Sequence, residues 1–113
     1  MIRATLVRQS MFAEFERDVH SKIENGESLT SENLNEIYYE LVKKYFGPST
    51  EINEEIKYEW ARIPHFYRCF YVYKYATGIT SAIVIASKIL AGEEGYVERY
   101  INMLSQGGAK DSL

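Results

Sequence analysis

A regular spacing of apolar side chains over residues 30–46 constrains the fold of this chain more than any other feature of its sequence. Apolar residues recur there at i, i+3, i+4, i+7, i+8 and i+11, which is typical of a helix with one buried face. Thr30 or Ser31 can cap the start of this helix, and Gly47-Pro48 ends it. The apolar residues of the stripe are Leu34, Ile37, Tyr38, Leu41, Val42 and Tyr45.

The rest of the sequence predicts further helices. The chain has only two prolines and seven glycines, which leaves room for long helices. We predict an all-α fold of four to five helices that forms a single helical unit over residues 1–113. Besides residues 30–46, helices are expected over residues 2–25, 51–63, 66–90 and 96–104.

Residues 66–90 form the most apolar of these segments, and a helix that is apolar on most sides must be buried on most sides. Its small residues allow a neighbouring helix to approach closely, and we expect Ala82 to lie in such a contact. A β-strand is the alternative over residues 79–85, where β-branched residues are frequent. The length of the segment and its small residues favour a helix. The small residues are Ala76, Gly78, Ser81, Ala82 and Ala86.

Composition excludes several classes of protein. Apolar residues make up 46% of the chain, too many for a disordered tail, and the net charge of −3 gives no basic surface for a nucleic acid. The longest uninterrupted apolar stretch, residues 82–86, is too short to span a membrane. The single cysteine cannot form an internal disulfide, and no signal peptide is recognisable. We therefore expect a cytoplasmic protein with no nucleic-acid or membrane partner.

Residues 58–78 concentrate the side chains that carry chemistry. They hold the only tryptophan, one of the two histidines and a dense group of tyrosines that follows Pro64. A small core needs few phenolic hydroxyls, because each buried hydroxyl must find a hydrogen-bond partner. The run therefore indicates hydrogen-bond donors gathered for a purpose.

The sequence resembles the oligoendopeptidase F family of zinc metallopeptidases, in the region that follows the zinc site of the family. The resemblance rests on RQSMFAEFE at residues 8–16, GESLT at 26–30, YFG at 45–47, the run at 60–78 and the glycine pair at 107–108. It implies the C-terminal portion of a helical, zincin-like (neurolysin-like) catalytic domain. The chain departs from the family pattern at Arg68-Cys69, where a small polar residue and a proline are expected.

The zinc motif of the family, His-Glu-x-x-His on one helix, is absent from this sequence. The resemblance implies zinc in the parent enzyme, and we expect no metal ligands and no cofactor in this chain. We expect a C-terminal piece that starts after the metal site and stops before the end of the family. His20 lacks a second histidine or cysteine nearby in the sequence and is expected to be solvated, and Cys69 has no sequence partner for nucleophilic chemistry.

The resemblance assigns His65 and Tyr75 as catalytic residues and Tyr71 as a substrate contact. Both side-chain types donate hydrogen bonds near neutral pH, which suits them to stabilise the oxyanion that forms when a peptide carbonyl is attacked. From the residues alone, His65 is equally a hydrogen-bonded histidine at a helix start. Tyr67, Tyr71 and Tyr75, spaced by four on one helical face, are equally a packing stripe.

Two functions follow. The first is the C-terminal portion of a zinc-dependent oligoendopeptidase that hydrolyses short peptides, inactive as an isolated chain because the zinc motif is missing. The alternative is a non-catalytic helical module that self-associates or binds a partner. Under both, apolar surface left uncovered on the isolated chain predicts a homo-oligomer.

Overall fold

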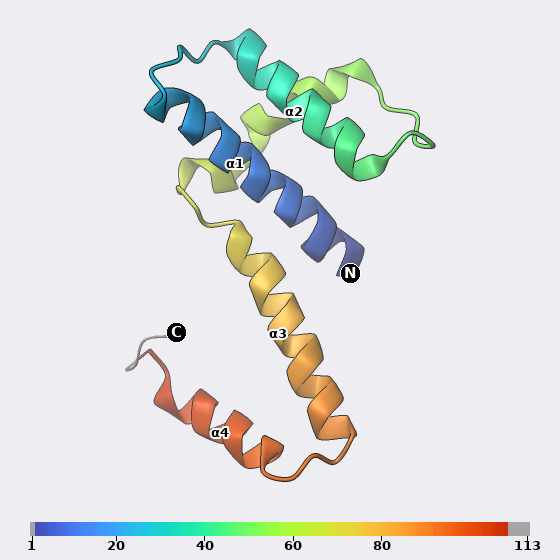
Figure 1. The fold of residues 1–113 in the computed structure, drawn as a ribbon, viewed down its shortest axis with the longest axis vertical. Helices are drawn as coiled ribbons and strands as arrows, with labels where there is room; N and C mark the ends of the chain where they lie inside the picture. Colours follow the sequence, from blue (N-terminus) through green and yellow to red (C-terminus); the bar gives the residue numbers. More distant parts are fainter. Residues whose placement is uncertain (1, 109–113) are drawn as a thin grey trace. The chain divides into compact units, whose positions relative to one another are not determined.

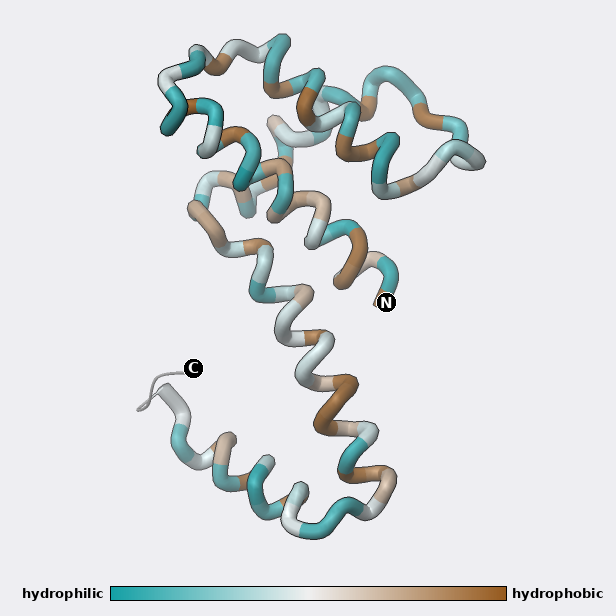
Figure 2. Tube along the Cα trace, viewed as in Figure 1, coloured by the Kyte–Doolittle hydropathy of each residue, from teal (hydrophilic) through white to brown (hydrophobic). Residues whose placement is uncertain are grey.

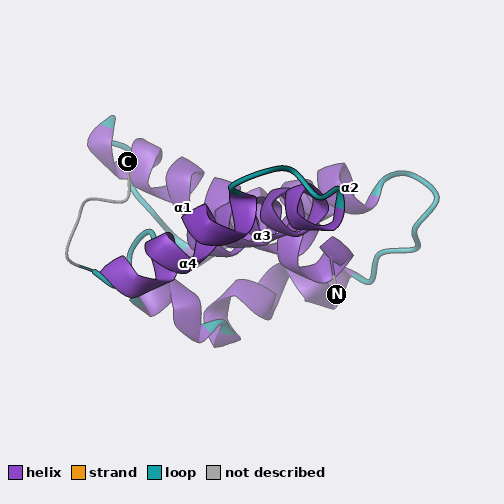
Figure 3. Ribbon diagram, turned by 90° about the horizontal axis from the view of Figure 1, so that it is seen from below, coloured by secondary structure: helices purple, strands orange, loops and turns teal. Residues whose placement is uncertain are grey.

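The structure is a computed structural model, which describes residues 2–108. All regular secondary structure in this range is helical, as Figure 3 shows, which confirms the all-α prediction. Residues 79–85 lie within a helix, so the strand alternative is wrong. Contacts divide the chain into two compact units, Met1–Thr77 and Gly78–Leu113, and each is described by itself. That residues 1–113 fold as a single unit stays a prediction.

The first unit is built on two antiparallel helices (Figure 1), α1 (Gln9–Glu24) and α2 (Ser31–Phe46). A π-helical turn, η1 (Ala4–Arg8), precedes α1. The side chain of Thr30 accepts a hydrogen bond from the backbone N–H of Asn33 at 3.2 Å, which is the predicted cap of α2. The predicted apolar stripe of α2 faces the core. The buried core residues are Met11, Phe12, Phe15, Tyr38, Leu41, Val42, Ile63 and Val72.

The core also holds a carboxylate that the sequence did not single out. Glu59 is buried and lies in η2, a 3₁₀ helix over Glu54–Arg62. Its Oε1 accepts from Arg8 at 2.7 Å and from Arg62 at 2.5 Å, and its Oε2 accepts from the Tyr38 hydroxyl at 2.7 Å. These partners satisfy the buried charge and join η1, α2 and η2.

The segment after η2 differs from the predicted long helix. A short 3₁₀ helix, η3 (Pro64–Tyr67), is followed by an irregular loop, and α3 begins only at Tyr73 and runs to Leu90. Phe70 in this loop has a left-handed backbone with φ of 57°. Its N–H donates to Oε1 of Glu16 on α1 at 2.5 Å. This tertiary bond, together with the turn, overrides the helical pattern between residues 66 and 72.

In the second unit, the end of α3 is followed by α4 (Tyr96–Gln106). An apolar groove of about 380 Å³ lies against the small residues of α3. Ala82 is exposed in this groove, so the expected close helix contact at Ala82 is not made within the described part of the chain. Figure 2 shows the hydrophobic residues along this part of α3. The groove is lined by Gly78, Ser81, Ala82, Ile85, Ala86, Ile89, Tyr100 and Met103.

Among residues 2–108, no helix combines the length and the apolar character that crossing a membrane requires.

Candidate active site

The position of His65 follows from its two neighbours in sequence. Pro64 restricts Ile63 to an extended backbone, observed at φ −84° and ψ 106°. Ile63 is buried in the core, and Phe66 packs on Phe12 and Phe15 with ring centroids 5.4 Å and 5.0 Å apart. His65 lies between these two anchors in η3 and is half-buried. Its ring therefore sits at the edge of the core.

The loop from Arg68 to Val72 positions the two tyrosines. The Glu16 carboxylate accepts a hydrogen bond from the N–H of Phe70, and Val72 is fully buried. Tyr71 lies between these two fixed points, and Tyr75 lies in the first turn of α3. Both tyrosine side chains are half-buried.

His65, Tyr71 and Tyr75 form one hydrogen-bonded cluster. The Tyr75 hydroxyl lies 3.3 Å from Nε2 of His65 and donates to the Tyr71 hydroxyl at 3.4 Å. The His65 ring stacks on Tyr71 with centroids 5.8 Å apart and an interplanar angle of 18°. Tyr75 meets both rings edge-on, with centroids 5.7 Å from His65 and 5.5 Å from Tyr71. The structure thus brings the three residues together.

Hydrogen bonding decides which protons of the cluster are available. Because the Tyr75 proton is directed at Tyr71, the Tyr75 oxygen is left to accept from His65 when Nε2 carries a proton. The hydrogen bond to Tyr71, with some desolvation, raises the pKa of Tyr75 above its ordinary value of 10.0. Tyr75 therefore stays a neutral donor at physiological pH. The Tyr71 hydroxyl retains a proton of its own to donate.

The cluster can stabilise negative charge on an oxygen atom. A charged oxygen is a stronger acceptor than the neutral Tyr71 hydroxyl, so the Tyr75 hydroxyl can donate its hydrogen bond to that oxygen in place of Tyr71. The Tyr71 hydroxyl can donate as well, and so can His65 when its Nε2 proton is not donated to Tyr75. None of the three provides a nucleophile activated by a strong base.

Tyr67 does not belong to this cluster, so the predicted stripe of three tyrosines spaced by four is only partly correct. Tyr67 lies in η3 rather than on the helix that carries Tyr75, and its side chain is 77% exposed. Its hydroxyl donates to the carbonyl of Ala61 at 3.2 Å. The break between η3 and α3 separates it from Tyr71.

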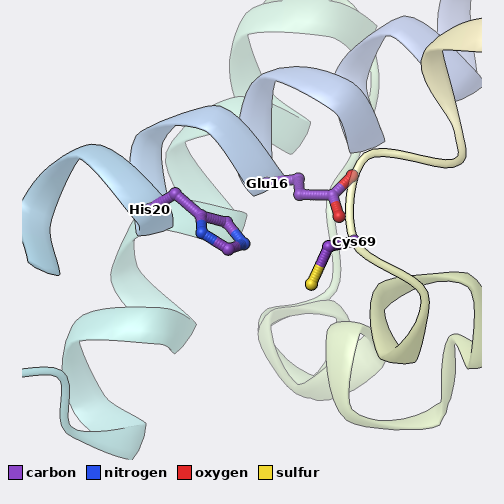
Figure 4. A group of neighbouring side chains, drawn as sticks. All are labelled: Glu16, His20 and Cys69. Carbon is purple, nitrogen blue, oxygen red and sulfur yellow. The ribbon is translucent and has the colours of Figure 1, made fainter. Parts of the chain in front are cut away.

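A second group of polar side chains contradicts the expectation that His20 is solvated. His20 is half-buried rather than solvated, and its ring packs on Phe70 with centroids 4.6 Å apart. Cys69 lies beside His20 and Glu16, and the nearest nitrogen, sulfur and oxygen atoms of the three residues are all within 4.8 Å of one another. Figure 4 shows the three side chains converging from α1 and from the loop. The sequence could not predict this proximity, because His20 and Cys69 are far apart in the chain and belong to different elements.

Comparison with known proteins decides the family. The model of peptidase family M3 matches residues 1–113. This chain belongs to peptidase family M3. Within the family it is similar to oligoendopeptidase F, as the sequence motifs predicted. Oligopeptidase PepF of Bacillus subtilis is 50% identical over 108 residues, and the chromosomal oligoendopeptidase F of Lactococcus lactis subsp. cremoris is 49% identical over 107 residues.

A solved structure gives the same answer for the fold of this M3 chain. The crystal structure of oligoendopeptidase-F from Enterococcus faecium matches with a TM-score of 0.90 and 46% sequence identity. This confirms the predicted helical peptidase fold.

The chain spans only part of the length of its M3 relatives. The matches cover 96% of this chain but 16% of the Bacillus subtilis protein, and 94% of this chain but 20% of the Enterococcus faecium chain.

The residues of this chain do not fit a catalytic zinc site of the type that the resemblance implies. The sequence contains two histidines and no His-Glu-x-x-His motif. His65 is hydrogen-bonded to Tyr75, and His20 lies with Glu16 and Cys69.

Proposed function

We propose that this chain forms part of a zinc-dependent oligoendopeptidase that hydrolyses short peptides, and that Tyr75 and His65 stabilise the oxyanion while Tyr71 contacts the substrate. The observation that carries the proposal is the hydrogen-bonded cluster of these three side chains at the edge of the core. Membership of a peptidase family supports the reaction class.

To stabilise an oxyanion, the cluster needs only hydrogen-bond donors that point at one oxygen atom. When water attacks a peptide carbonyl, the carbonyl oxygen becomes negatively charged. Donors that reach this oxygen at about 3 Å stabilise the transition state more than the bound substrate. Tyr75 would exchange its hydrogen bond to Tyr71 for one to the oxyanion, and His65 would donate through a ring nitrogen.

Zinc, which the resemblance implies, would activate the attacking water when bound. The sequence lacks the zinc motif of the family, so the proposal assigns no ligand of that zinc to this chain. It confines the role of the chain to substrate binding and to the oxyanion. A cytoplasmic location also belongs to this proposal.

The test is the substitution Tyr75→Phe in a whole peptidase that contains this sequence. Loss of one oxyanion donor typically lowers kcat by about 10²–10³-fold, and we expect a loss of that size with KM and zinc content little changed. Tyr73→Phe is the matched control, because Tyr73 is 52% exposed at the start of the same helix. Equal kcat for the two variants would overturn the catalytic assignment.

A second candidate function rests on the uncovered groove of the second unit. Large side chains stay exposed on α3 and α4, among them Leu90 at 87% and Leu104 at 59%. Apolar surface of this kind favours association. We propose that the isolated chain forms a homo-oligomer through it, and a non-catalytic binding module remains the alternative to the enzyme.

A further inference from the structure

We infer that Glu16, His20 and Cys69 form a binding site for zinc or a chemically similar divalent cation. The bound ion would link the loop before α3 to α1. The site uses none of the residues of the His65–Tyr71–Tyr75 cluster and is independent of the proposed function. Its starting observation is the convergence of three ligand atoms of different chemistry within 4.8 Å (Figure 4).

The geometry is close to that of a bound ion. Zinc bonds of about 2.0–2.3 Å to nitrogen, oxygen and sulfur place tetrahedral ligand atoms roughly 3.4–3.7 Å apart. The ligand atoms must therefore approach by about 1 Å. Glu16 and His20 are one helical turn apart on α1, so their side chains share a face. Cys69 is exposed and can rotate to close the remaining distance.

Two contacts hold the first two ligands in place before any ion arrives. Oε1 of Glu16 already accepts the N–H of Phe70, which leaves Oε2 free to bind a metal while its partner oxygen is fixed. The ring of His20 is held against Phe70. Hydrogen bonds and packing behind metal ligands orient them in this way and raise affinity.

The ligand set indicates which ion would bind. A thiolate and an imidazole favour zinc and related ions over magnesium or calcium, which prefer oxygen ligands. Three protein ligands leave one tetrahedral position, and exposure of Cys69 allows water to fill it. Binding would release the thiol proton of Cys69 to solvent.

A bound ion would restrain the segment that leads to the candidate active site. Cys69 and Phe70 immediately precede Tyr71, and Phe70 has the left-handed backbone. Joining Cys69 to α1 adds a third link to this loop, beside the Glu16–Phe70 hydrogen bond and the buried Val72. The ion therefore has a structural role, in contrast to the catalytic zinc of the family.

The test uses the purified 113-residue chain, kept reduced and free of metal. Cobalt(II) serves as the spectroscopic probe, and zinc is then titrated against a chromophoric chelator. We expect one ion per chain, a thiolate-to-cobalt charge-transfer band, zinc affinity in the micromolar range or tighter, and a rise in Tm on zinc addition. Cys69→Ser and His20→Gln should each weaken zinc binding at least tenfold and abolish the Tm rise.

His65→Gln is the matched control, because it removes the other histidine and leaves the site intact. Its zinc affinity should equal that of the unaltered chain. Circular dichroism measures whether each variant keeps its helical content. If a variant loses its helices, the cobalt spectrum of the unaltered chain decides the outcome instead. Absence of a saturable one-to-one cobalt complex, or His20→Gln binding as tightly as the unaltered chain, would overturn the inference.

Discussion

The hydroxyl of Tyr75 lies 3.3 Å from Nε2 of His65, although the two residues belong to a helix and a 3₁₀ turn separated by an irregular loop. Tyr71 completes the contact from within that loop. The pairing depends on how the loop is held, and the core supplies its fixed points.

The roles of His65 and Tyr75 should be interdependent. In a whole peptidase containing this sequence, His65→Ala and Tyr75→Phe should each lower kcat, and the double variant should lower it by less than the product of the two effects. Residues that act on the same charge as a unit lose their contributions together. A double-mutant cycle on kcat/KM measures this. If the two effects multiplied fully, the two residues would act independently and the prediction would be wrong.

Glu59 should stabilise the fold through its charge. Glu59→Gln weakens two ion pairs and the charged hydrogen bond from Tyr38, so we expect a loss of about 1.5–3 kcal/mol in the free energy of unfolding. Urea denaturation measures the difference. Glu54→Gln is the control, because Glu54 is 83% exposed and lies 3.9 Å from Lys57. Similar stability of the two variants would contradict the prediction.

The same carboxylate gives the stability a pH dependence. Burial alone would raise the pKa of Glu59, but the hydrogen bonds from Arg8 and Tyr38 outweigh it and hold the pKa below its ordinary value of 4.5. A lowered folded-state pKa contributes stability that is fully present above the unfolded pKa and is lost as pH falls through the folded pKa. Acid titration of Tm should therefore be less steep below about pH 4.5 in Glu59→Gln than in the unaltered chain.

Glu16 should act as a positioning residue for the loop. Glu16→Ala leaves the N–H of Phe70 without its carboxylate acceptor, and in the whole peptidase this should lower kcat by displacing Tyr71 and Tyr75. Glu16→Gln keeps an acceptor oxygen and should restore most of the activity. Because Glu16→Gln keeps the acceptor oxygen but loses the carboxylate that would bind the metal, its activity separates this effect from metal binding at the same residue. A failure of Glu16→Gln to outperform Glu16→Ala would remove the positioning role.

The isolated chain should not hydrolyse peptides, and it should associate. No His-Glu-x-x-His motif lies in the sequence, so a quenched short peptide should stay intact in its presence. Exposed apolar residues of α3 and α4 should drive formation of a dimer or larger assembly, which light scattering detects. Charged substitutions in the groove, such as Ala82→Glu, should shift the assembly towards monomer. Turnover by the pure chain would contradict the first expectation, and a monomer at all concentrations would contradict the second.

Helix periodicity predicted most of the fold. The apolar stripe and the threonine cap placed α2 correctly, and the pattern before Gly26 placed the first helix, which ends at Glu24. Both signals are local, because they depend on residues a few positions apart. The family was also predicted from local signals, because the motifs that indicated it are short stretches of sequence.

Contacts between distant elements could not be predicted from the sequence. The start of α3 at Tyr73 depends on the hydrogen bond from Phe70 to Glu16, and the pattern of residues 66–72 alone suits a helix. The burial of Glu59 depends on Arg8 and Tyr38 approaching from two other elements. The proximity of Cys69 to His20 has the same origin, and the proposed metal site accordingly departs from the expectation of no metal ligands in this chain.

Tyr75 should bind the transition state more strongly than the substrate. The most direct measurement is the inhibition constant of a phosphinic peptide, a tetrahedral transition-state analogue, for the whole peptidase and for its Tyr75→Phe variant, beside the KM of the matching substrate. We predict that the variant binds the analogue about 10²–10³-fold more weakly while KM changes little. Unchanged affinity for the analogue would contradict an oxyanion-stabilising role and leave Tyr75 a packing residue.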